Sequence, residues 1–203
     1  MGTLDQLINE LFALPEKERI VAINEAKQAL HQISPFSQEP TDCVIWIPAE
    51  QVEANDYNPN AVAPPEMKLL ETSISEDGYT QPIVAWGCNG YYEVVDGFHR
   101  NRVGKESKAV RSRTKGYLPI TLINSERQDK SDRIAATIRH NRARGKHQVS
   151  AMSDIVLELS RRNWNDVKIG RELGMEPDEV LRLKQITGLA ELFSDEEFSE
   201  AWE

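Results

Sequence analysis

Long apolar runs are missing from this sequence. No stretch approaches the roughly 18 uninterrupted apolar residues that a membrane-spanning helix needs. The N-terminus, Met1-Gly2-Thr3-Leu4-Asp5, lacks the basic start and the apolar core of a secretion signal. We therefore expect a cytoplasmic protein without a membrane partner.

Cysteine is scarce, since Cys43 and Cys88 are the two in 203 residues. They form no Cys-x-x-Cys pair, and no paired histidines complete a zinc-ligand set. A disulfide between them would be unusual in a reducing compartment. No Ser-His-Asp set and no P-loop are visible. The sequence therefore predicts neither a zinc protein nor one of these two common enzyme classes.

Positive charge is in deficit overall, with a net charge of −9, but it is concentrated in one segment. Residues 97–147 hold 14 Lys or Arg against 4 Asp or Glu, a local net of +10, so the remainder carries −19. A basic block in an acidic protein favours one anion-facing surface. The alternative is a solvated face of mixed charge with a mobile loop at 104–116.

The first 40 residues form a separate N-terminal region. Apolar residues at helical spacing predict a helical segment over 3–33 that Pro15 interrupts. Residues 34–40, Ser-Pro-Phe-Ser-Gln-Glu-Pro, have the composition of a linker. The helices either cap the next domain or bind a partner, and the sequence leaves both open.

Residues 41–146 predict a compact α+β domain. Short β-branched or aromatic runs indicate strands, and longer segments with apolar residues one turn apart indicate helices. The expected strands are 43–47, 81–86, 91–95 and 117–123, and the expected helices are 64–76, 99–105 and 127–140.

Residues 147–203 predict a helical domain similar to a helix-turn-helix. Helices are expected over 149–162, over 166–173 with a stop at Gly174, and from Pro177 towards Ile186. The would-be recognition helix opens with Glu176, Asp178 and Glu179, which would oppose phosphate, while Arg182 and Lys184 come later and could touch the DNA backbone. DNA binding and a structural or partner-binding bundle remain alternatives.

One short motif carries most of the chemistry, Val94-Val95-Asp96-Gly97-Phe98-His99-Arg100-Asn101-Arg102. A strand ends at a glycine and a basic helix begins, so unpaired amide groups, Arg100 and Arg102 can face an anion. Asp96 would repel phosphate unless it holds a hydroxyl or a divalent metal such as Mg²⁺. Alternatively, Asp96 is the N-cap of the helix.

A second basic motif, Arg139-His140-Asn141-Arg142-Ala143-Arg144-Gly145-Lys146-His147, ends a helix. Compensation of the helix dipole explains one or two of these cations. Their density favours a second wall of the anion site that includes His140 and Arg142.

Residues 44–145 resemble the N-terminal domain of the ParB family, which shares its fold with sulfiredoxin and certain small-molecule kinases. The matching segments are Ile47-Pro48; Asn55, Tyr57 and Pro59; Gly78 to Val84; Gly97, Arg100 and Arg102; and Asn141 with Arg144. The resemblance implies a nucleoside triphosphate, CTP or ATP, with Mg²⁺. Gly97, Arg100, Arg102, Asn141 and Arg144 would then contact phosphate, with Gln81 and Tyr79 near the base or sugar.

The sequence departs from that family at Asn60, Phe98, His99 and His140, which puts CTP hydrolysis in doubt. The kinase branch of the fold also carries an Asp-Gly-x-His-Arg string. A weak NTPase or phosphotransferase would use Asp96 and His99, with Glu50 or Glu53 as base.

The leading hypothesis is a nucleotide-binding, DNA-associated regulator of the ParB type, acting in transcription co-activation, partition or phage defence. In size and tail the chain looks like the IbrB-type co-activators of prophage gene expression. The alternatives are a phosphotransferase and an adaptor with a degenerate site. A protein partner or a homodimer is expected.

Overall fold

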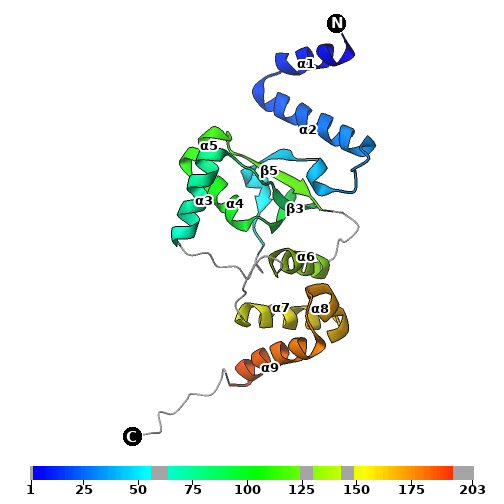
Figure 1. The fold of residues 1–203 in the computed structure, drawn as a ribbon, viewed down its shortest axis with the longest axis vertical. Helices are drawn as coiled ribbons and strands as arrows, with labels where there is room; N and C mark the ends of the chain where they lie inside the picture. The colour runs from blue at the N-terminus through cyan, green and yellow to red at the C-terminus, as the bar shows by residue number, and fades with distance from the viewer. Residues whose placement is uncertain (1, 56–63, 124–129, 143–148, 194–203) are drawn as a thin grey trace. The chain divides into compact units, whose positions relative to one another are not determined.

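The computed structural model describes residues 2–55, 64–123, 130–142 and 149–193 (Figure 1). The chain divides into two compact units, one made of 1–55 and 62–127 and the other made of 128–203 together with 56–61. Among the described helices, none is long and apolar enough to cross a membrane. Each unit has its own hydrophobic core.

The first unit is built on a five-stranded mixed sheet in the order β1-β5-β3-β4-β2. β3 pairs in parallel with β5 and antiparallel with β4, β1 pairs antiparallel with β5, and β2 pairs in parallel with β4. The strands are β1 (Ile45–Pro48), β2 (Val52–Glu53), β3 (Ile83–Cys88), β4 (Tyr91–Asp96) and β5 (Tyr117–Leu122). The four predicted strands are confirmed, and β2 is an addition.

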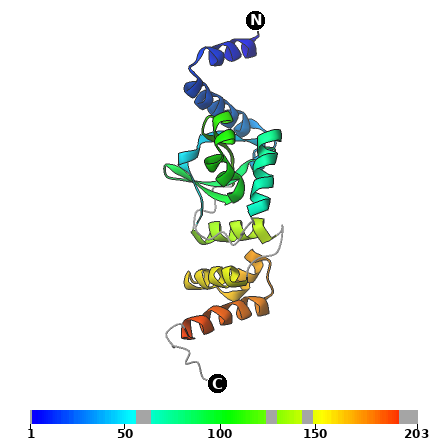
Figure 2. The same ribbon diagram turned by 90° about the vertical axis from the view of Figure 1, so that its left-hand side faces the viewer.

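Three helices pack beside this sheet, α3 (Pro64–Asp77), α4 (Phe98–Glu106) and α5 (Lys108–Arg113), as both ribbon views show (Figures 1 and 2). Ile74, Val103 and Val110 form a small apolar core where they meet. The alternative of a mobile loop at 104–116 is wrong, because Ser107 caps α5 and Val110 is fully buried.

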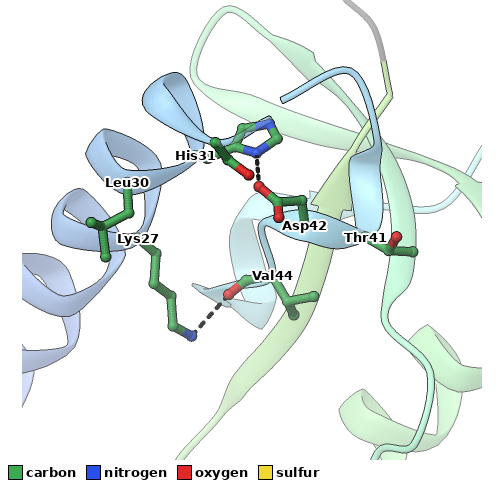
Figure 3. A pocket seen from close by; sticks show the side chains of 7 residues that line it. Lys27, Leu30, His31, Thr41, Asp42 and Val44 are labelled. Carbon is green, nitrogen blue, oxygen red and sulfur yellow. Dashed lines mark hydrogen bonds and ion pairs between the residues drawn. The ribbon is translucent and has the colours of Figure 1, made fainter. Parts of the chain in front are cut away.

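The N-terminal helices are α1 (Thr3–Ala13) and α2 (Glu16–Ile33), which confirms the predicted break at Pro15. Polar side chains fasten α2 to the sheet. The Asn24 amide exchanges two hydrogen bonds with the backbone of Trp46, at 2.7 and 3.0 Å, and Lys27 donates to the Val44 carbonyl at 2.9 Å. Figure 3 shows the contact between Lys27 and Val44. It also shows the pair of His31 and Asp42, whose Nδ1 and Oδ2 atoms are 2.6 Å apart. Asp42 belongs to the short 3-10 helix η1 (Pro40–Asp42).

The second unit contains α6 (Lys130–Arg142), α7 (Val149–Arg161), α8 (Asp166–Leu173) and α9 (Pro177–Phe193). Ile134 and Ile138 of α6 share one core with Leu159, Leu173 and residues of α9. The compact unit therefore begins at residue 128, whereas the sequence predicted a domain boundary after 146.

Candidate phosphate site

The turn between β4 and α4 positions the first site motif. Asp96 ends β4, and Gly97 is the N-cap of α4 with a φ of 89°, which favours glycine. The backbone amide of Asn101 donates the first helical hydrogen bond, to the Gly97 carbonyl at 2.8 Å. The N-cap residue is Gly97, which has no side chain to cap the helix, so the alternative that made Asp96 the N-cap is wrong. The leading amide groups of α4 lack intrahelical partners, as at any helix start.

Arg100 joins this turn to the start of β3. Its guanidinium donates to the Gln81 side chain at 3.1 Å and to the Pro82 carbonyl at 3.2 Å. A third contact, 3.5 Å long, reaches Asp96 Oδ2. Because its side chain is only 18% exposed, Arg100 is a fixed cation beside the helix N-terminus.

Asp96 is buried, and Arg100 lies against its carboxylate. This ion pair offsets the repulsion that a carboxylate would exert on a nearby phosphate. Among the described residues, no group of three or more His, Cys, Asp or Glu side chains could hold a metal ion. Mg²⁺ bound here would therefore need phosphate oxygens among its ligands, as is common for this ion.

His99 and Arg102 lie on the first turns of α4 and differ in environment. His99 is half-buried and packs edge to face on Phe98, with ring centroids 5.5 Å apart. Burial lowers the pKa of His99 below its usual 6.5, and the charges of Arg102 and then Arg100 lower the pKa further. Arg102 is exposed and pairs at 3.0 Å with the exposed Glu106. Such a surface pair is weak, which leaves Arg102 able to turn to a ligand.

Tyr79 and Gln81, expected near a base or sugar, both contact Arg100. The Tyr79 hydroxyl donates to the Arg100 carbonyl at 3.0 Å, and burial raises the pKa of Tyr79 to about 12. The Tyr79 ring packs against two apolar cores, so Tyr79 helps to hold α4 in its position in the first unit. Gln81 is exposed and orients the guanidinium of Arg100.

The neighbours of Glu50 and Glu53 are cations that do not belong to the turn between β4 and α4. Glu50, on the 3-10 helix η2 (Ala49–Gln51), lines an open surface pocket of about 700 Å³ with Lys17, Lys108, Arg111 and Lys115. Glu53 lies opposite Glu93 in the sheet. Burial lowers the pKa of Lys105, while the charges of Glu53 and then Glu50 raise the pKa. Lys105 donates to the Val52 carbonyl.

Two cations of the basic block make contacts inside the first unit. Arg113 donates to the Ser75 and Ile74 carbonyls at 2.6 Å, at the end of α3. Lys115 pairs with Glu16 of α2. These two cations therefore hold segments of the first unit together, and the basic count overstated the charge that is open to an anion.

The predicted second wall falls in the second unit. His140, Asn141 and Arg142 are the last residues of α6, and their side chains, like Arg144, lie outside the described residues. Arg139, one residue earlier, bonds Glu172 of α8 at 2.5 Å. A joint site of Asn141 and Arg144 with Gly97 therefore remains a prediction.

Sequence reasoning missed Asn101. This residue is 3% exposed, and its Oδ1 has no hydrogen-bond partner in the described part of the chain. It lies one turn after Gly97, on the side of α4 that faces the sheet unit's interior. In the sequence, the position of this uncharged polar residue between Arg100 and Arg102 was the one feature that could have drawn attention to Asn101.

The second unit has the helix-turn-helix geometry. Asn165 caps α8 by accepting from the Lys168 amide at 2.8 Å, and Gly174 ends α8 with a φ of 66°. A Cβ atom on Gly170 would lie 2.6 Å from the Met175 carbonyl oxygen, so a glycine is needed for this tight turn. On α9 and just before it, Glu176, Asp178, Arg182 and Gln185 are exposed, whereas Lys184 pairs with Asp166 of α8.

Two family models match the chain. Residues 36–114 match the ParB N-terminal domain, and residues 147–195 match the IbrB-like C-terminal HTH domain. A curated relative, the "Uncharacterized protein YbdM" of Escherichia coli K12, is 59% identical over 193 residues, which cover 95% of this chain and 91% of the relative.

Solved ParB structures are more distant. C-terminally truncated ParB from Caulobacter crescentus complexed with CTP-gamma-S is 19% identical, with a TM-score of 0.40, over 74% of this chain and 83% of that chain. The same protein complexed to the centromeric parS site is 16% identical, with a TM-score of 0.46, over 73% of this chain and 75% of that chain. A Pnob8-like ParB-N domain is 12% identical, with a TM-score of 0.48, over 75% of this chain and 73% of that chain.

The family models confirm the expected fold class, and the identity to YbdM covers nearly the whole chain. The chain therefore belongs to the family of YbdM, and it is a ParB-like, IbrB-type protein with a C-terminal helix-turn-helix domain.

Proposed function

We propose that this protein is a DNA-associated regulator whose first unit binds the phosphates of a nucleoside triphosphate at the N-terminus of α4. One observation carries the proposal. Helix α4 starts at a left-handed glycine, which has no side chain of its own to cap the helix, so the first amide groups can donate to an anion. Those donors and the helix dipole together favour a phosphate at this position.

The cations around this helix start support the same reading. Arg100 is held in place by Gln81, Pro82 and Asp96, so its charge is positioned before a ligand arrives. A preorganised group loses little conformational entropy on binding. Arg102 contributes differently, because it can exchange the exposed Glu106 for a phosphate oxygen.

The nucleotide is proposed to be CTP or ATP with Mg²⁺. Asn141 and Arg144, with His140 and Arg142 beside them, are proposed to add a second group of phosphate contacts. A magnesium ion would supply charge neutralisation between phosphate oxygens and could take Asp96 as one protein ligand. The resemblance of these residues to the ParB phosphate motifs supports this part of the proposal.

Contact with DNA is assigned to the helix-turn-helix of α8 and α9. Glu176 and Asp178 are exposed at the start of α9 and would face phosphate unfavourably. Arg182 and Gln185 are exposed one to two turns later. We therefore expect a small number of phosphate contacts and weak binding by a single chain.

Calorimetry tests the nucleotide proposal. The full chain is titrated at low salt with CTP, ATP, GTP and UTP, each with Mg²⁺, and at least one should bind. Arg102→Ala should weaken that binding about 10-fold or more, because one charge-assisted contact is lost. Arg111→Ala is the matched control, since Arg111 is exposed on α5 and lines the separate pocket that contains Glu50. Absence of heat with all four nucleotides, or a larger loss in the control, would contradict the proposal.

No contact of the described residues favours phosphotransfer over binding. The carboxylate of Asp96 is buried against Arg100, and His99 packs on Phe98. The candidate bases Glu50 and Glu53 have Lys105 and the α5 cations as neighbours. We therefore keep the binding function as the single proposal.

A further inference from the structure

A cleft lies between α2 and the turn that joins α5 to β5. Its volume is about 540 Å³, which is within the range of small-molecule sites in proteins. Two polar contacts hold α2 beside this cleft. Glu16 pairs with Lys115, and the Asn24 side chain exchanges two hydrogen bonds with the backbone of Trp46. No residue of α2 is buried, so the helix does not fill the cleft with its own side chains.

One wall of the cleft is a single face of α2. Its lining residues follow the three- and four-residue spacing of a helix face: Glu16, Arg19, Ile20 and Ile23. Ile20 is half-buried, and Ile23 is 37% exposed. Val21 is on another side of the helix and does not line the cleft. The α2 wall therefore offers two apolar side chains with charged residues beside them.

The other wall is aromatic and belongs to the sheet. Pro48 of β1 lies opposite Tyr117 of β5, so Trp46, two residues from Pro48, is on the same face as Tyr117. The Trp46 ring packs edge to face on the Tyr79 ring, with centroids 6.4 Å apart. Trp46 and Tyr117 are only half-buried. Aromatic side chains have few rotatable bonds, so this wall needs little ordering when a ligand binds.

The cleft carries an excess of positive charge. Among its described lining residues are three cations and one carboxylate, a net charge of +2: Arg19, Arg113, Lys115 and Glu16. Glu16 pairs with Lys115. In the part of the chain that the structure describes, Arg113 contacts carbonyl groups at the end of α3, Arg19 contacts the Phe12 ring, and neither pairs with a carboxylate. Two cations therefore remain for an acidic ligand.

A neighbouring pocket adds to this positive charge. The pocket that contains Glu50 shares Lys115 and Tyr117 with the cleft. That pocket brings three further cations, Lys17, Lys108 and Arg111. Clustered charges of one sign raise the local concentration of ions of the opposite sign. An anion in the cleft therefore lies in a positive potential that extends beyond the residues that line the cleft.

A hydroxyl group without a partner lies between two of these cations in the chain. Thr114 lines the cleft between Arg113 and Lys115, and its Oγ1 atom is buried with no hydrogen-bond partner among the described residues. Buried hydroxyl groups nearly always have a partner, so one that has none needs an explanation. A ligand carboxylate held by the two cations would provide the acceptor that this hydroxyl lacks.

We infer that this cleft binds a small organic acid with an aromatic or alkyl body. The body packs between the two isoleucines of the α2 wall and the aromatic wall, and the acid group lies beside Thr114. A bound acid adds apolar contacts between α2 and the sheet, so it should also raise the melting temperature. The cleft shares no residue with the turn between β4 and α4. The inference therefore goes beyond the proposed nucleotide binding and does not rest on it.

Calorimetry of the full chain with a matched pair of ligands tests the inference. Cinnamate has an aromatic body and a carboxylate, whereas cinnamamide has nearly the same shape without the charge. Cinnamate should bind with a Kd of about 1 mM or tighter, as expected for a ligand of this size. Cinnamamide should bind about 10-fold or more weakly, because the cations no longer contribute a charge-assisted contact. In an NMR titration, cinnamate should shift the backbone amides of Thr114 and Lys115 more than that of Phe98.

Two variants test the two halves of the cleft. Ile23→Gln should weaken cinnamate binding about 5-fold or more, because a polar group replaces part of the apolar wall. Val21→Gln is the matched control, since Val21 is 54% exposed outside the cleft, and it should leave the affinity unchanged. Thr114→Val should weaken binding about 10-fold, because a hydrogen bond to a charged group is lost. Since the Thr114 hydroxyl has no partner in the described chain, Thr114→Val should not lower the melting temperature of the ligand-free protein.

Four results would each overturn the inference. The first is absence of binding by both cinnamate and decanoate at about 10 mM, which would leave the cleft to a different kind of occupant. The second is equal affinity for cinnamate and cinnamamide, because the cations would then recognise nothing. The third is an equal loss of affinity in Ile23→Gln and Val21→Gln. The fourth is a set of amide shifts centred on Phe98, which would place the ligand at the start of α4.

Discussion

The guanidinium of Arg100 lies against the backbone of Gly97, so that a Cβ atom on Gly97 would come within 2.9 Å of Nη2. Any side chain at residue 97 must therefore displace the arginine. Because Gly97 also has a positive φ, the turn, the helix start and the fixed cation depend on the same glycine. This relationship links the stability of the first unit to its candidate phosphate site.

Gly97→Ala should lower the free energy of unfolding by about 2–3 kcal/mol and reduce nucleotide binding. The positive φ costs about 1–2 kcal/mol for a residue with a Cβ atom, and displacement of Arg100 adds to it. Gly90→Ala is the matched control, since Gly90 has a φ of 87° with nothing within 4 Å of a Cβ atom. Urea unfolding measures both variants. Equal losses would show that the Arg100 contact adds nothing.

Gly104→Ala should also destabilise the protein, although alanine is normally the better helix former by about 1 kcal/mol. A Cβ atom at this position would lie 2.3 Å from both Leu118 Cδ2 and the Tyr79 hydroxyl oxygen. Overpacking of this kind costs about 1–3 kcal/mol. The melting temperature of Gly104→Ala should be lower than that of wild type. Gly87→Ala, which has open space around its Cβ position, should change the melting temperature little. A stabilised Gly104→Ala variant would refute the close packing of α4 on β5.

His99 should make stability depend on pH. Its folded pKa lies below 6.5, first because of burial and then because of Arg102 and Arg100. As pH falls below about 6.5, His99 takes up a proton in the unfolded chain but not yet in the folded chain. The free energy of unfolding therefore decreases as the pH falls from about 6.5 to the lowered pKa of His99 in the folded protein. The urea midpoint of wild type should therefore fall more over this range than that of His99→Gln. Parallel curves would contradict the account.

A phosphate bound beside His99 should reverse the direction of this shift. The anion favours the charged imidazole and raises the pKa of His99, so nucleotide affinity should increase as the pH falls. In His99→Gln this increase should be smaller. NMR of the imidazole protons with and without nucleotide measures the pKa directly, and a pKa that does not move on saturation would place the phosphate elsewhere.

Arg182→Ala should weaken binding to DNA at every sequence and reduce the salt dependence by about one phosphate contact. Arg182 is exposed on α9, beyond the acidic first turn. Arg171→Ala on α8 tests a second exposed cation of the same unit. Fluorescence anisotropy with labelled duplex DNA across a salt series gives, for each variant, the slope of the logarithm of DNA affinity against the logarithm of salt concentration. An unchanged slope for Arg182→Ala would remove α9 from the interface.

Much of the fold followed from local sequence signals. The run Tyr91 to Val95 is aromatic and β-branched, Asn89-Gly90 makes the preceding turn, and Gly174 ends α8 as expected. These features act over a few residues, so the sequence alone expresses them. Strand β2 was missed because its two residues are defined by pairing with β4, which is a tertiary contact.

The site was predictable in its residues and less so in its contacts. Gly97 and Arg100 lie together at the start of α4, whereas Arg102 pairs with Glu106 further along the helix, so that a joint phosphate contact of the three residues stays a prediction. The clamp of Arg100 on Gln81 and Pro82 joins segments far apart in sequence, and no local pattern announces it. The same holds for the cations of the basic block, such as Arg113, which the fold uses to cap α3.

The most direct test of the phosphate site is an amide NMR titration of the full chain with CTP and Mg²⁺, repeated with ATP. We predict that the amides of Phe98 and His99, which follow the N-cap glycine of α4, show the largest shifts and saturate with the calorimetric affinity. Shifts confined to Lys108 and Arg111, which line the pocket that contains Glu50, or no shift at Phe98 and His99, would contradict a phosphate site at the start of α4.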